Sequence, residues 1–305
     1  MWRIAASVAP LIGLVLVTGR PASAQELEPK AYSASPVGAT FFVSSLARSS
    51  GSIVFDPSLP ITDVDATVNG AFFGVGTTFD LFGKLALASV AVPYAWGDVS
   101  GQVFEEARTV TRSGLADTRV RLSVNLRGND AMRLGEFVKA PRKAIVGTSV
   151  TMLVPTGEYD RTKLINLGNN RWGFKPEVGV AVPIGHWDID AYAGVWLFTA
   201  NDAFFPGGLE RTQDPILAVQ AHVSYTFKPR LWLAVDSTWY SGGKSRVDGG
   251  APTVAISNSR LGATLSIPAG RRQSFKIAYS NGVSVRTGTD FSTVALGWQW
   301  LWFRR

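Results

Sequence analysis

The chain has 305 residues, of which 46% are hydrophobic and 17% charged, with ten Trp, 31 Gly, no Cys and a formal net charge of +7. The large apolar fraction, with less charge than the roughly one quarter usual in soluble domains, excludes an intrinsically disordered chain. The absence of Cys excludes a disulfide framework, a Cys-ligated metal or iron–sulfur site and a thiol nucleophile.

The first 24 residues have the pattern of a secretory signal peptide. A basic start with Arg3 precedes an apolar stretch over residues 4–17, and Ala22 and Ala24 provide small residues for cleavage before Gln25. The apolar stretch is shorter than the about 20 residues that a membrane anchor needs. We therefore predict export, and removal of two arginines and no acid lowers the formal charge to +5.

The segment that follows, residues 25–36, is polar and contains Pro29 and Pro36. Chain termini are commonly loose, but a short polar segment can also tuck into the interior of a barrel. The sequence leaves both readings open, a periplasmic tail or a lumen plug ahead of a barrel over residues 37–305.

Beyond residue 37, apolar and polar side chains alternate with a period of two between turns rich in Gly, Pro, Asn and Asp. Leu231, Leu233 and Val235, for example, lie on the face opposite Asp236. Successive side chains of a strand point to opposite faces, so each segment has one apolar and one more polar face. A soluble β-sandwich would show the same alternation, so periodicity alone does not decide the class.

Three further features favour a membrane barrel. The segments run for about 10 to 13 residues, the length that a tilted strand needs to cross a bilayer. Short turns near 80–83, 185–186, 228–230 and 269–272 contrast with long polar loops at 48–66, 95–114, 156–170, 199–214 and 241–256. Aromatic residues gather at segment ends, as in the girdles at membrane surfaces; they are Trp172, Phe174, Trp187, Phe198, Tyr225, Phe227, Trp239 and those within 298–303.

We predict an all-β fold, a transmembrane antiparallel up-and-down β-barrel of about 12 strands with periplasmic termini. The predicted strands are 38–47, 67–79, 84–94, 115–127, 143–155, 171–183, 187–198, 215–227, 231–240, 257–267, 273–283 and 290–302. The alternation of apolar and polar residues is weak in 38–47 and 84–94, so totals of ten or fourteen strands are also compatible with the sequence. The connection 128–142 is long for its side, and the near-helical spacing of Met132, Leu134, Phe137 and Val138 predicts a short periplasmic helix.

Several motifs resemble the outer-membrane transporter family labelled for the meta-pathway of phenol degradation. The central ones are Pro155-Thr156-Gly157-Glu158-Tyr159-Asp160, the run from Lys163 through Gly168-Asn169-Asn170 to Trp172, and Lys175-Pro176-Glu177. Flanking ones are Ala31-Tyr32-Ser33, Ser35-Pro36-Val37-Gly38, Phe55-Asp56-Pro57-Ser58-Leu59-Pro60, Ser113-Gly114-Leu115-Ala116-Asp117 and Tyr192-Ala193-Gly194-Val195-Trp196. The resemblance covers essentially the whole mature chain. It implies an outer-membrane barrel of a transporter type, with uptake of aromatic compounds presumed from genetic context and no catalytic residues to transfer.

The last strand carries the pattern that the barrel-assembly machinery reads, apolar residues at alternate positions before a terminal aromatic residue. The candidate assembly signal is Val294, Leu296, Trp298, Trp300 and Trp302. Phe303, Arg304 and Arg305 overhang it.

Parity also assigns a set of polar and aromatic side chains to the lumen. The lumen-lining candidates are Asp117, Arg119, Arg121, Lys175, Glu177, Asp190, Tyr192, Trp196, Gln220, His222, Asp236, Arg260 and Lys276. Either these charges pair across a narrow lumen and fill it, or some of them line a path for a passing solute. About a dozen strands enclose a narrow or gated pore rather than an open one.

Other functional classes fit poorly. A lipase needs Ser, His and a polar orienter on the lipid side, whereas His186 falls in a turn and His222 faces inward. Two isolated histidines give no metal site, no cofactor motif occurs, and thinly spread Lys and Arg on an exported chain argue against nucleic acid.

We therefore predict no enzyme, but a channel or transporter for small solutes, aromatic or anionic ones among them, in the outer membrane of a Gram-negative bacterium. The alternative is a structural or adhesion-like barrel without transport. Expected partners are outer-membrane lipids, lipopolysaccharide, the barrel-assembly machinery and an unidentified solute.

Overall fold

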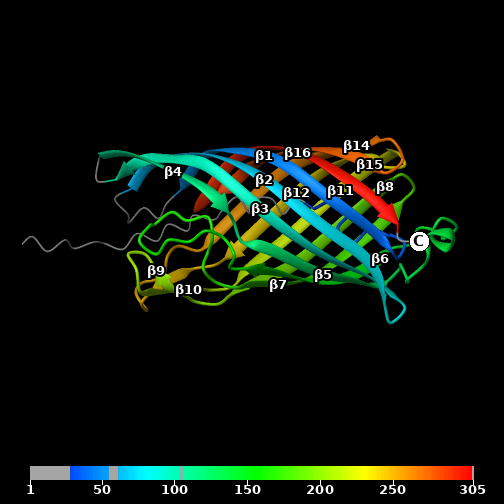
Figure 1. The fold of residues 1–305 in the computed structure, drawn as a ribbon, viewed down its shortest axis with the longest axis horizontal. Helices are drawn as coiled ribbons and strands as arrows, with labels where there is room; N and C mark the ends of the chain where they lie inside the picture. The colour runs from blue at the N-terminus through cyan, green and yellow to red at the C-terminus, as the bar shows by residue number, and fades with distance from the viewer. Residues whose placement is uncertain (1–27, 55–60, 104–105, 304–305) are drawn as a thin grey trace, which may run out of the picture.

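The structure, a computed structural model, describes residues 28–54, 61–103 and 106–303, and most of them lie in the strands of one barrel (Figure 1). The predicted signal peptide and the motif at 55–60 lie outside the described residues. Within the described ranges, no helix is long and apolar enough to cross a membrane.

The barrel is a closed antiparallel ring, because each wall strand pairs with the next and β1 pairs with β16, Ala39 opposite Phe303. β4 and β5 both pair with β3 and form one wall strand that is interrupted at Ala116 and Asp117, so the described wall has twelve strands, as predicted. The wall elements are β1 (Ala39–Val54), β2 (Ile61–Leu81), β3 (Lys84–Val103), β4 (Glu106–Leu115), β5 (Thr118–Arg127), β6 (Ile145–Val154), β7 (Gly173–Ile184), β8 (Trp187–Phe198), β11 (Ile216–Lys228), β12 (Leu231–Gly242), β14 (Ile256–Ala269), β15 (Gln273–Val285) and β16 (Gly288–Phe303).

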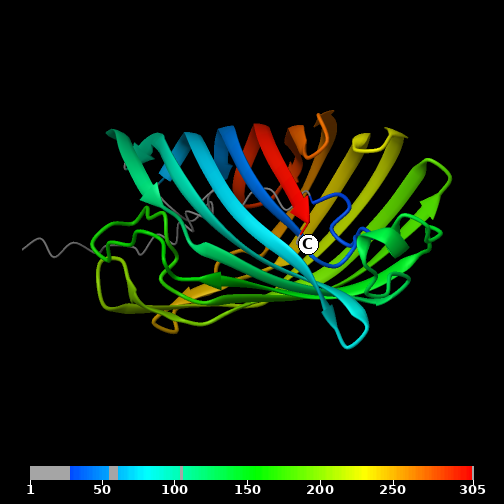
Figure 2. The same ribbon diagram turned by 45° about the vertical axis from the view of Figure 1, so that its right-hand side comes forward.

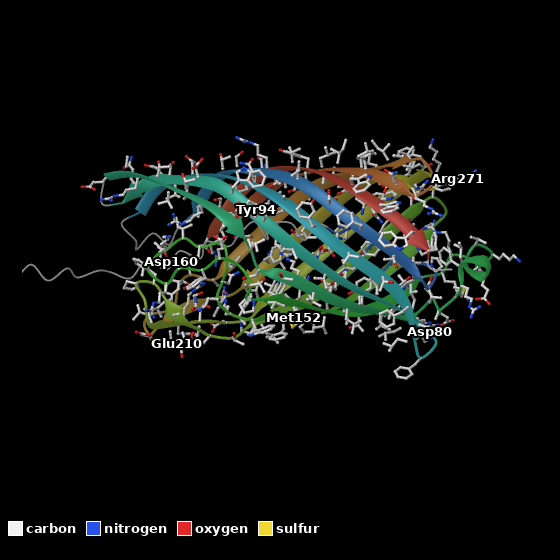
Figure 3. The ribbon with its side chains drawn as sticks, in the orientation of Figure 1. Asp80, Tyr94, Met152, Asp160, Glu210 and Arg271 are labelled. Atoms are coloured by element: carbon white, nitrogen blue, oxygen red, sulfur yellow. The ribbon has the colours of Figure 1, made fainter. Side chains whose placement is uncertain are left out.

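The two ends of the barrel differ. Asp80 and Arg271 mark short turns at one end, and Asp160 and Glu210 mark long loops at the other (Figure 3). Short turns face the periplasm in outer-membrane barrels, which assigns the first end to the periplasm and the second to the exterior. The predicted helix in 128–142 is present at the periplasmic end as the short α1 (Leu134–Phe137).

A salt bridge links the connection that contains α1 to the barrel rim. The Lys84 ammonium lies 2.7 Å from the Asp130 carboxylate, and this hydrogen bond holds the pKa of Asp130 below its ordinary value. Both side chains are exposed, so the pair contributes little to the stability of the fold.

Two of the predicted loops are wrong in extent. β1 continues to Val54 and β2 begins at Ile61, so most of 48–66 is strand; β3 and β4 likewise fill most of 95–114. Beyond the membrane both faces of a strand meet water, so the backbone ladder continues without the apolar alternation that marks a strand in the sequence. The loops 199–214 and 241–256 contribute β9 (Asn201–Phe204), β10 (Leu209–Gln213) and β13 (Ser245–Val247), which pair into a small sheet at the outer end.

The two faces of the wall are sorted as parity predicts. In β7, Val178 is 59% exposed on the outer surface, while its neighbours Glu177 and Gly179 are buried. The outward apolar set includes Val180, Val219, Leu233, Val235, Val294, Leu296 and Trp300. A soluble globule would bury these side chains and expose Asp236 and Arg260, which here are almost inaccessible on the inner face. The outer face is therefore built to contact lipid.

Aromatic side chains form contacts near both rims. At the periplasmic rim the Tyr225 ring lies 4.9 Å from Trp187 and 5.0 Å from Phe227, and at the outer rim Trp172 stacks on Phe174 at 6.3 Å between ring centroids. Such rings occupy the lipid headgroup level. Phe198 is an exception to the predicted girdle, because it shares the inward parity of Trp196 and packs against the buried cluster of Trp196, Ile216 and Ala218.

Candidate functional site in the lumen

The lumen wall formed by β5, β6 and β7 carries a group of cations around one carboxylate. The Glu177 carboxylate lies 2.9 Å from the Lys175 ammonium and 3.5 Å from the Arg121 guanidinium. Arg121 also donates to the Ser149 hydroxyl at 3.3 Å, and Lys175 lies 5.5 Å from the centroid of the Trp196 ring. Alternation along each strand places all of these side chains on the inner face, so the predicted candidates of β5 and β7 do come together.

The adjoining wall of β8, β11 and β12 is acidic. His222 lies between Asp190 and Asp236 in the strand register, and its Nδ1 is 2.7 Å from the Asp236 carboxylate. Thr264 donates to the other Asp236 oxygen at 2.8 Å, and the Tyr192 and His222 ring centroids are 5.2 Å apart. His222 and Asp236 are fully buried, so the Asp236 carboxylate is satisfied by the wall itself.

Gln220 and Thr238 occupy the next row toward the outer end, opposite each other on β11 and β12. Both side chains are buried. Among the described residues, the Gln220 Oε1, Thr238 Oγ1 and His222 Nε2 atoms have no hydrogen-bond partner. Buried polar atoms without partners are costly unless water or a solute contacts them, so this row is a polar surface directed toward the lumen.

The remaining cations lie on β14 and β15. The Arg260 guanidinium donates to the Ser280 hydroxyl at 3.3 Å and to the Phe291 carbonyl oxygen. Lys276 lies 5.7 Å from the centroid of the Trp232 ring. Among the described residues, Arg119, Arg260 and Lys276 have no carboxylate of the wall within ion-pair distance.

Asp117 is at the outer mouth rather than in the narrow part of the lumen, and its carboxylate is occupied by the loop over 155–172. One oxygen accepts the Gly157 amide at 3.1 Å, and the other accepts the Asn169 amide at 2.9 Å and its side-chain amide at 2.7 Å. A Cβ at Gly157 would lie 2.6 Å from the Gly168 Cα, so only glycines permit this close crossing of the chain. The central motif therefore folds a loop over the mouth.

Further contacts of the same loop continue to the small outer sheet. The Tyr159 hydroxyl donates to the Ala203 carbonyl oxygen at 3.1 Å and accepts the Asn201 side-chain amide at 2.9 Å. Within the loop, Asp160 accepts hydrogen bonds from the Thr162 hydroxyl and amide and pairs with Lys163, and these contacts hold the pKa of Asp160 well below its ordinary value. The loop is thus an ordered cover.

Residues 28–36 lie inside the barrel, although none of them is among the lumen-lining candidates predicted from the sequence. In Figure 2 the dark-blue start of the described chain runs within the ring of strands near the periplasmic end. Lys30 forms a salt bridge with Asp188, and its amide donates to Asp190 at 3.1 Å. The Glu28 carboxylate lies 3.2 Å from the Arg121 guanidinium. Asp188 could have been found by its inward parity in β8, whereas nothing local in the sequence marks Glu28 or Lys30.

Tyr32 is the most deeply held residue of this segment. Its side chain is buried, its hydroxyl donates to Glu177 at 3.0 Å, and the same hydroxyl is 3.0 Å from the Ser149 hydroxyl. The ring meets Tyr192 edge to face at 5.1 Å, and the Arg121 guanidinium lies 5.3 Å from its centroid. The motif Ala31-Tyr32-Ser33 was a signal of its importance, although not of its position.

Two glycines make room for the Tyr32 ring. Gly147 and Gly179 are opposite each other on β6 and β7. A Cβ at Gly147 would lie 2.2 Å from the ring, and one at Gly179 would lie 2.3 Å from it. Because any larger residue would collide with the ring, the wall has a fitted seat for an aromatic side chain.

The lumen also contains no obvious metal site, because among the residues described no group of three or more His, Asp and Glu is arranged to hold an ion. His186 lies in an exposed periplasmic turn, where its Nδ1 is 3.0 Å from the Thr226 carbonyl oxygen.

Comparison with solved structures shows the same barrel. The chain is similar to the COG4313 outer membrane channel from Pseudomonas putida F1, with a TM-score of 0.76 and 21% identity over 91% of this chain and 100% of that chain. It also resembles the β domain of the Bordetella autotransporter Brka, with a TM-score of 0.50 and 12% identity over 87% of this chain and 100% of that one. The transport unit of the autotransporter AIDA-I from Escherichia coli gives a TM-score of 0.50 and 10% identity over 86% and 90% of the two chains.

These likenesses show an outer-membrane β-barrel, whose apolar outer face contacts membrane lipid. No curated protein sequence matches the chain. Residues 48–298, most of the chain, match the family described as "Putative MetA-pathway of phenol degradation". The chain is therefore a member of this phenol-degradation family of outer-membrane β-barrels.

Proposed function

We propose that the protein is an outer-membrane channel for small anionic solutes, aromatic ones among them. The observation that carries the proposal is the distribution of charge in the lumen. Two acids of the wall are satisfied by the wall itself, since Glu177 is paired with Lys175 and Arg121, and Asp236 is bonded to His222 and Thr264, whereas Asp190 accepts the Lys30 amide of the N-terminal segment. Arg119 and Lys276 have no such wall carboxylate among the described residues. The lumen therefore attracts anions.

Aromatic rings next to these cations support the aromatic part of the proposal. Lys175 lies near Trp196 and Lys276 near Trp232, each within 6 Å of the ring centroid. A flat solute with a carboxylate can stack on such a ring while its charge meets the neighbouring cation. The proposed role is therefore the passage of such a solute through the barrel.

The proposal is tested by the conductance of the purified protein in planar bilayers. We expect small, discrete openings that prefer chloride to potassium in a salt gradient. Replacing Arg119 and Lys276 together with Gln removes two lumen cations, and the preference for the anion should fall. Arg48→Gln is the matched control, since Arg48 lies near the outer end and is hydrogen-bonded to Asn69.

The alternative of a structural barrel without transport draws support from residues 28–36, which occupy part of the lumen. Correctly folded protein that never conducts, with the segment in place or displaced, would favour this alternative and overturn the channel proposal. Export by the N-terminal signal peptide and recognition of the last strand by the assembly machinery belong to the same proposal.

A further inference from the structure

We infer that residues 28–36 are a displaceable plug, and that Tyr32 and Glu28 occupy a binding site whose free ligand is a small phenolic carboxylate. The inference rests on the proposed function, which it deepens by naming the solute class and the device that controls access.

The first argument is the seat of Tyr32. Gly147 and Gly179 leave the space in which the Tyr32 ring lies, and the Tyr192 ring packs against one side of it. At the far end, Glu177 and Ser149 bind the phenol hydroxyl, each at 3.0 Å. This constellation recognises a hydroxylated aromatic ring, because it combines ring contacts with an acceptor for the phenol proton.

The second argument is the position of the Glu28 carboxylate. It lies 3.2 Å from Arg121, and Lys175, Arg119 and Lys276 also act on it electrostatically. These cations belong to β5, β7 and β15, so side chains from separate parts of the wall interact with the one carboxylate of Glu28. The Glu28 side chain nevertheless remains 54% accessible, so it lies in an open part of the lumen rather than in packed protein.

The third argument joins the two positions. Arg121 contacts the Glu28 carboxylate with one nitrogen and lies over the Tyr32 ring, 5.3 Å from its centroid. A single solute that carries a carboxylate on a phenol ring would satisfy Arg121 in both ways at once. The segment thus presents, on two side chains, the groups that such a solute would present on one ring.

The anchoring of the segment is compatible with release. Besides Tyr32 and Glu28, the segment is held by the Lys30–Asp188 pair and by two amides, that of Lys30 on Asp190 and that of Ala31 on the Tyr192 hydroxyl, each at 3.1 Å. Asp188 is shared with Arg142 from the connection that follows α1. When the segment leaves, Asp188 keeps Arg142, and Glu177 keeps Lys175 and Arg121. Asp188 and Glu177 are therefore not left as unpaired buried charges, while Asp190 loses the Lys30 amide and lies opposite His222 on the neighbouring strand.

The test measures binding of 4-hydroxybenzoate to the purified full-length barrel by calorimetry, alongside bilayer conductance. In the double variant Glu28→Gln, Tyr32→Ala the site is vacated, and we expect affinity to rise about tenfold or more and conductance to increase, because a site occupied most of the time binds correspondingly less free ligand. Adding Arg121→Ser should abolish the gain. Glu136→Gln, which alters an exposed acid of α1, is the matched control.

Two comparisons establish the chemistry of the site. Benzoate lacks the phenol hydroxyl, and 4-hydroxybenzyl alcohol lacks the carboxylate, so each should bind the vacated site more weakly than 4-hydroxybenzoate. Gly147→Val displaces the Tyr32 ring but fills the seat itself, so conductance should rise without any gain in binding. Heat-modifiable migration on gels verifies that each variant is folded.

The outcomes separate this inference from the channel proposal. If the wild type conducts but the double variant neither binds more ligand nor conducts more, the plug inference is wrong and the channel remains. If the vacated site binds benzoate or the alcohol as tightly as 4-hydroxybenzoate, the assignment of the solute class is wrong. If every folded variant is silent in bilayers, the channel proposal fails.

Discussion

Replacing Asp117 with Ala should release the loop over the barrel mouth without harming the barrel. The carboxylate accepts three hydrogen bonds from this loop, two from the backbone amides of Gly157 and Asn169 and one from the Asn169 side chain. The partly buried Asn169 side-chain amide can turn to water, but the two backbone amides lose their acceptor in the closed loop. The substitution therefore raises the free energy of the closed loop relative to the open loop.

The magnitude follows from the burial of these two amides. An unsatisfied buried donor costs about 1–3 kcal/mol, and Gly157 and Asn169 are only partly buried, so about 1.5 kcal/mol each is appropriate. The sum of about 3 kcal/mol corresponds to roughly a 100-fold shift in the opening equilibrium, since about 1.4 kcal/mol is a factor of ten. Contacts of Tyr159 with Ala203 and Asn201 are unchanged.

Hydrogen–deuterium exchange with mass spectrometry measures this opening. Peptides over 155–170 should exchange about 100-fold faster in Asp117→Ala, whereas peptides of β7 and β11 should not change. Asp98→Ala is the matched control, because Asp98 is an exposed acid of β3 that accepts one hydrogen bond from Thr111 at 2.6 Å. Equal exchange in the two variants would refute the reasoning.

Two further predictions concern the outer face and the loop. Val178→Arg places a charge in hydrocarbon and should lower the free energy of unfolding by about 2–4 kcal/mol in a denaturant titration in lipid, whereas Val178→Leu should not; tolerance of Arg would mean that this face does not contact lipid. The lowered pKa of Asp160 stabilises the closed loop above the ordinary pKa of the carboxyl group, a stabilisation lost only as pH falls through the lower folded value. Exchange protection over 158–166 should therefore persist from pH 7 to about 4, and a loss already near pH 5 would contradict this cause.

Alternation along the strands was enough to predict the wall and most of its inner face. Val178 and Glu177 are sorted to opposite sides because a strand in a barrel has lipid on one side and a polar lumen on the other. The same rule failed for the strand extensions in 48–54 and 106–114, where both faces meet water and no apolar period remains. It also failed for Phe198, because an aromatic residue at a strand end can pack inside the mouth as well as in a girdle.

The N-terminal segment shows a different limit. Parity gives a direction only to residues of a strand, and residues 28–36 belong to none. Their place depends on contacts with residues distant in sequence, such as Lys30 with Asp188 and Tyr32 with Glu177. Composition could therefore name a tail and a plug as alternatives, but only the three-dimensional arrangement of β5, β7 and β8 brings the partners of these side chains together.

The ion selectivity of the lumen also depends on contacts that the sequence does not reveal. The sequence places both signs on the inner face in nearly equal numbers, and equal numbers alone predict no preference. In the folded barrel, however, the acids Glu177, Asp188 and Asp236 each have a partner that belongs to the wall or the periplasmic connection, and only Asp190 among these lumen acids depends on the N-terminal segment. Arg119 and Lys276 instead interact electrostatically with Glu28, which belongs to the displaceable segment 28–36. Departure of the segment would therefore unmask cations more than acids, so an open state of this barrel should favour anions even though its lumen is close to neutral in composition.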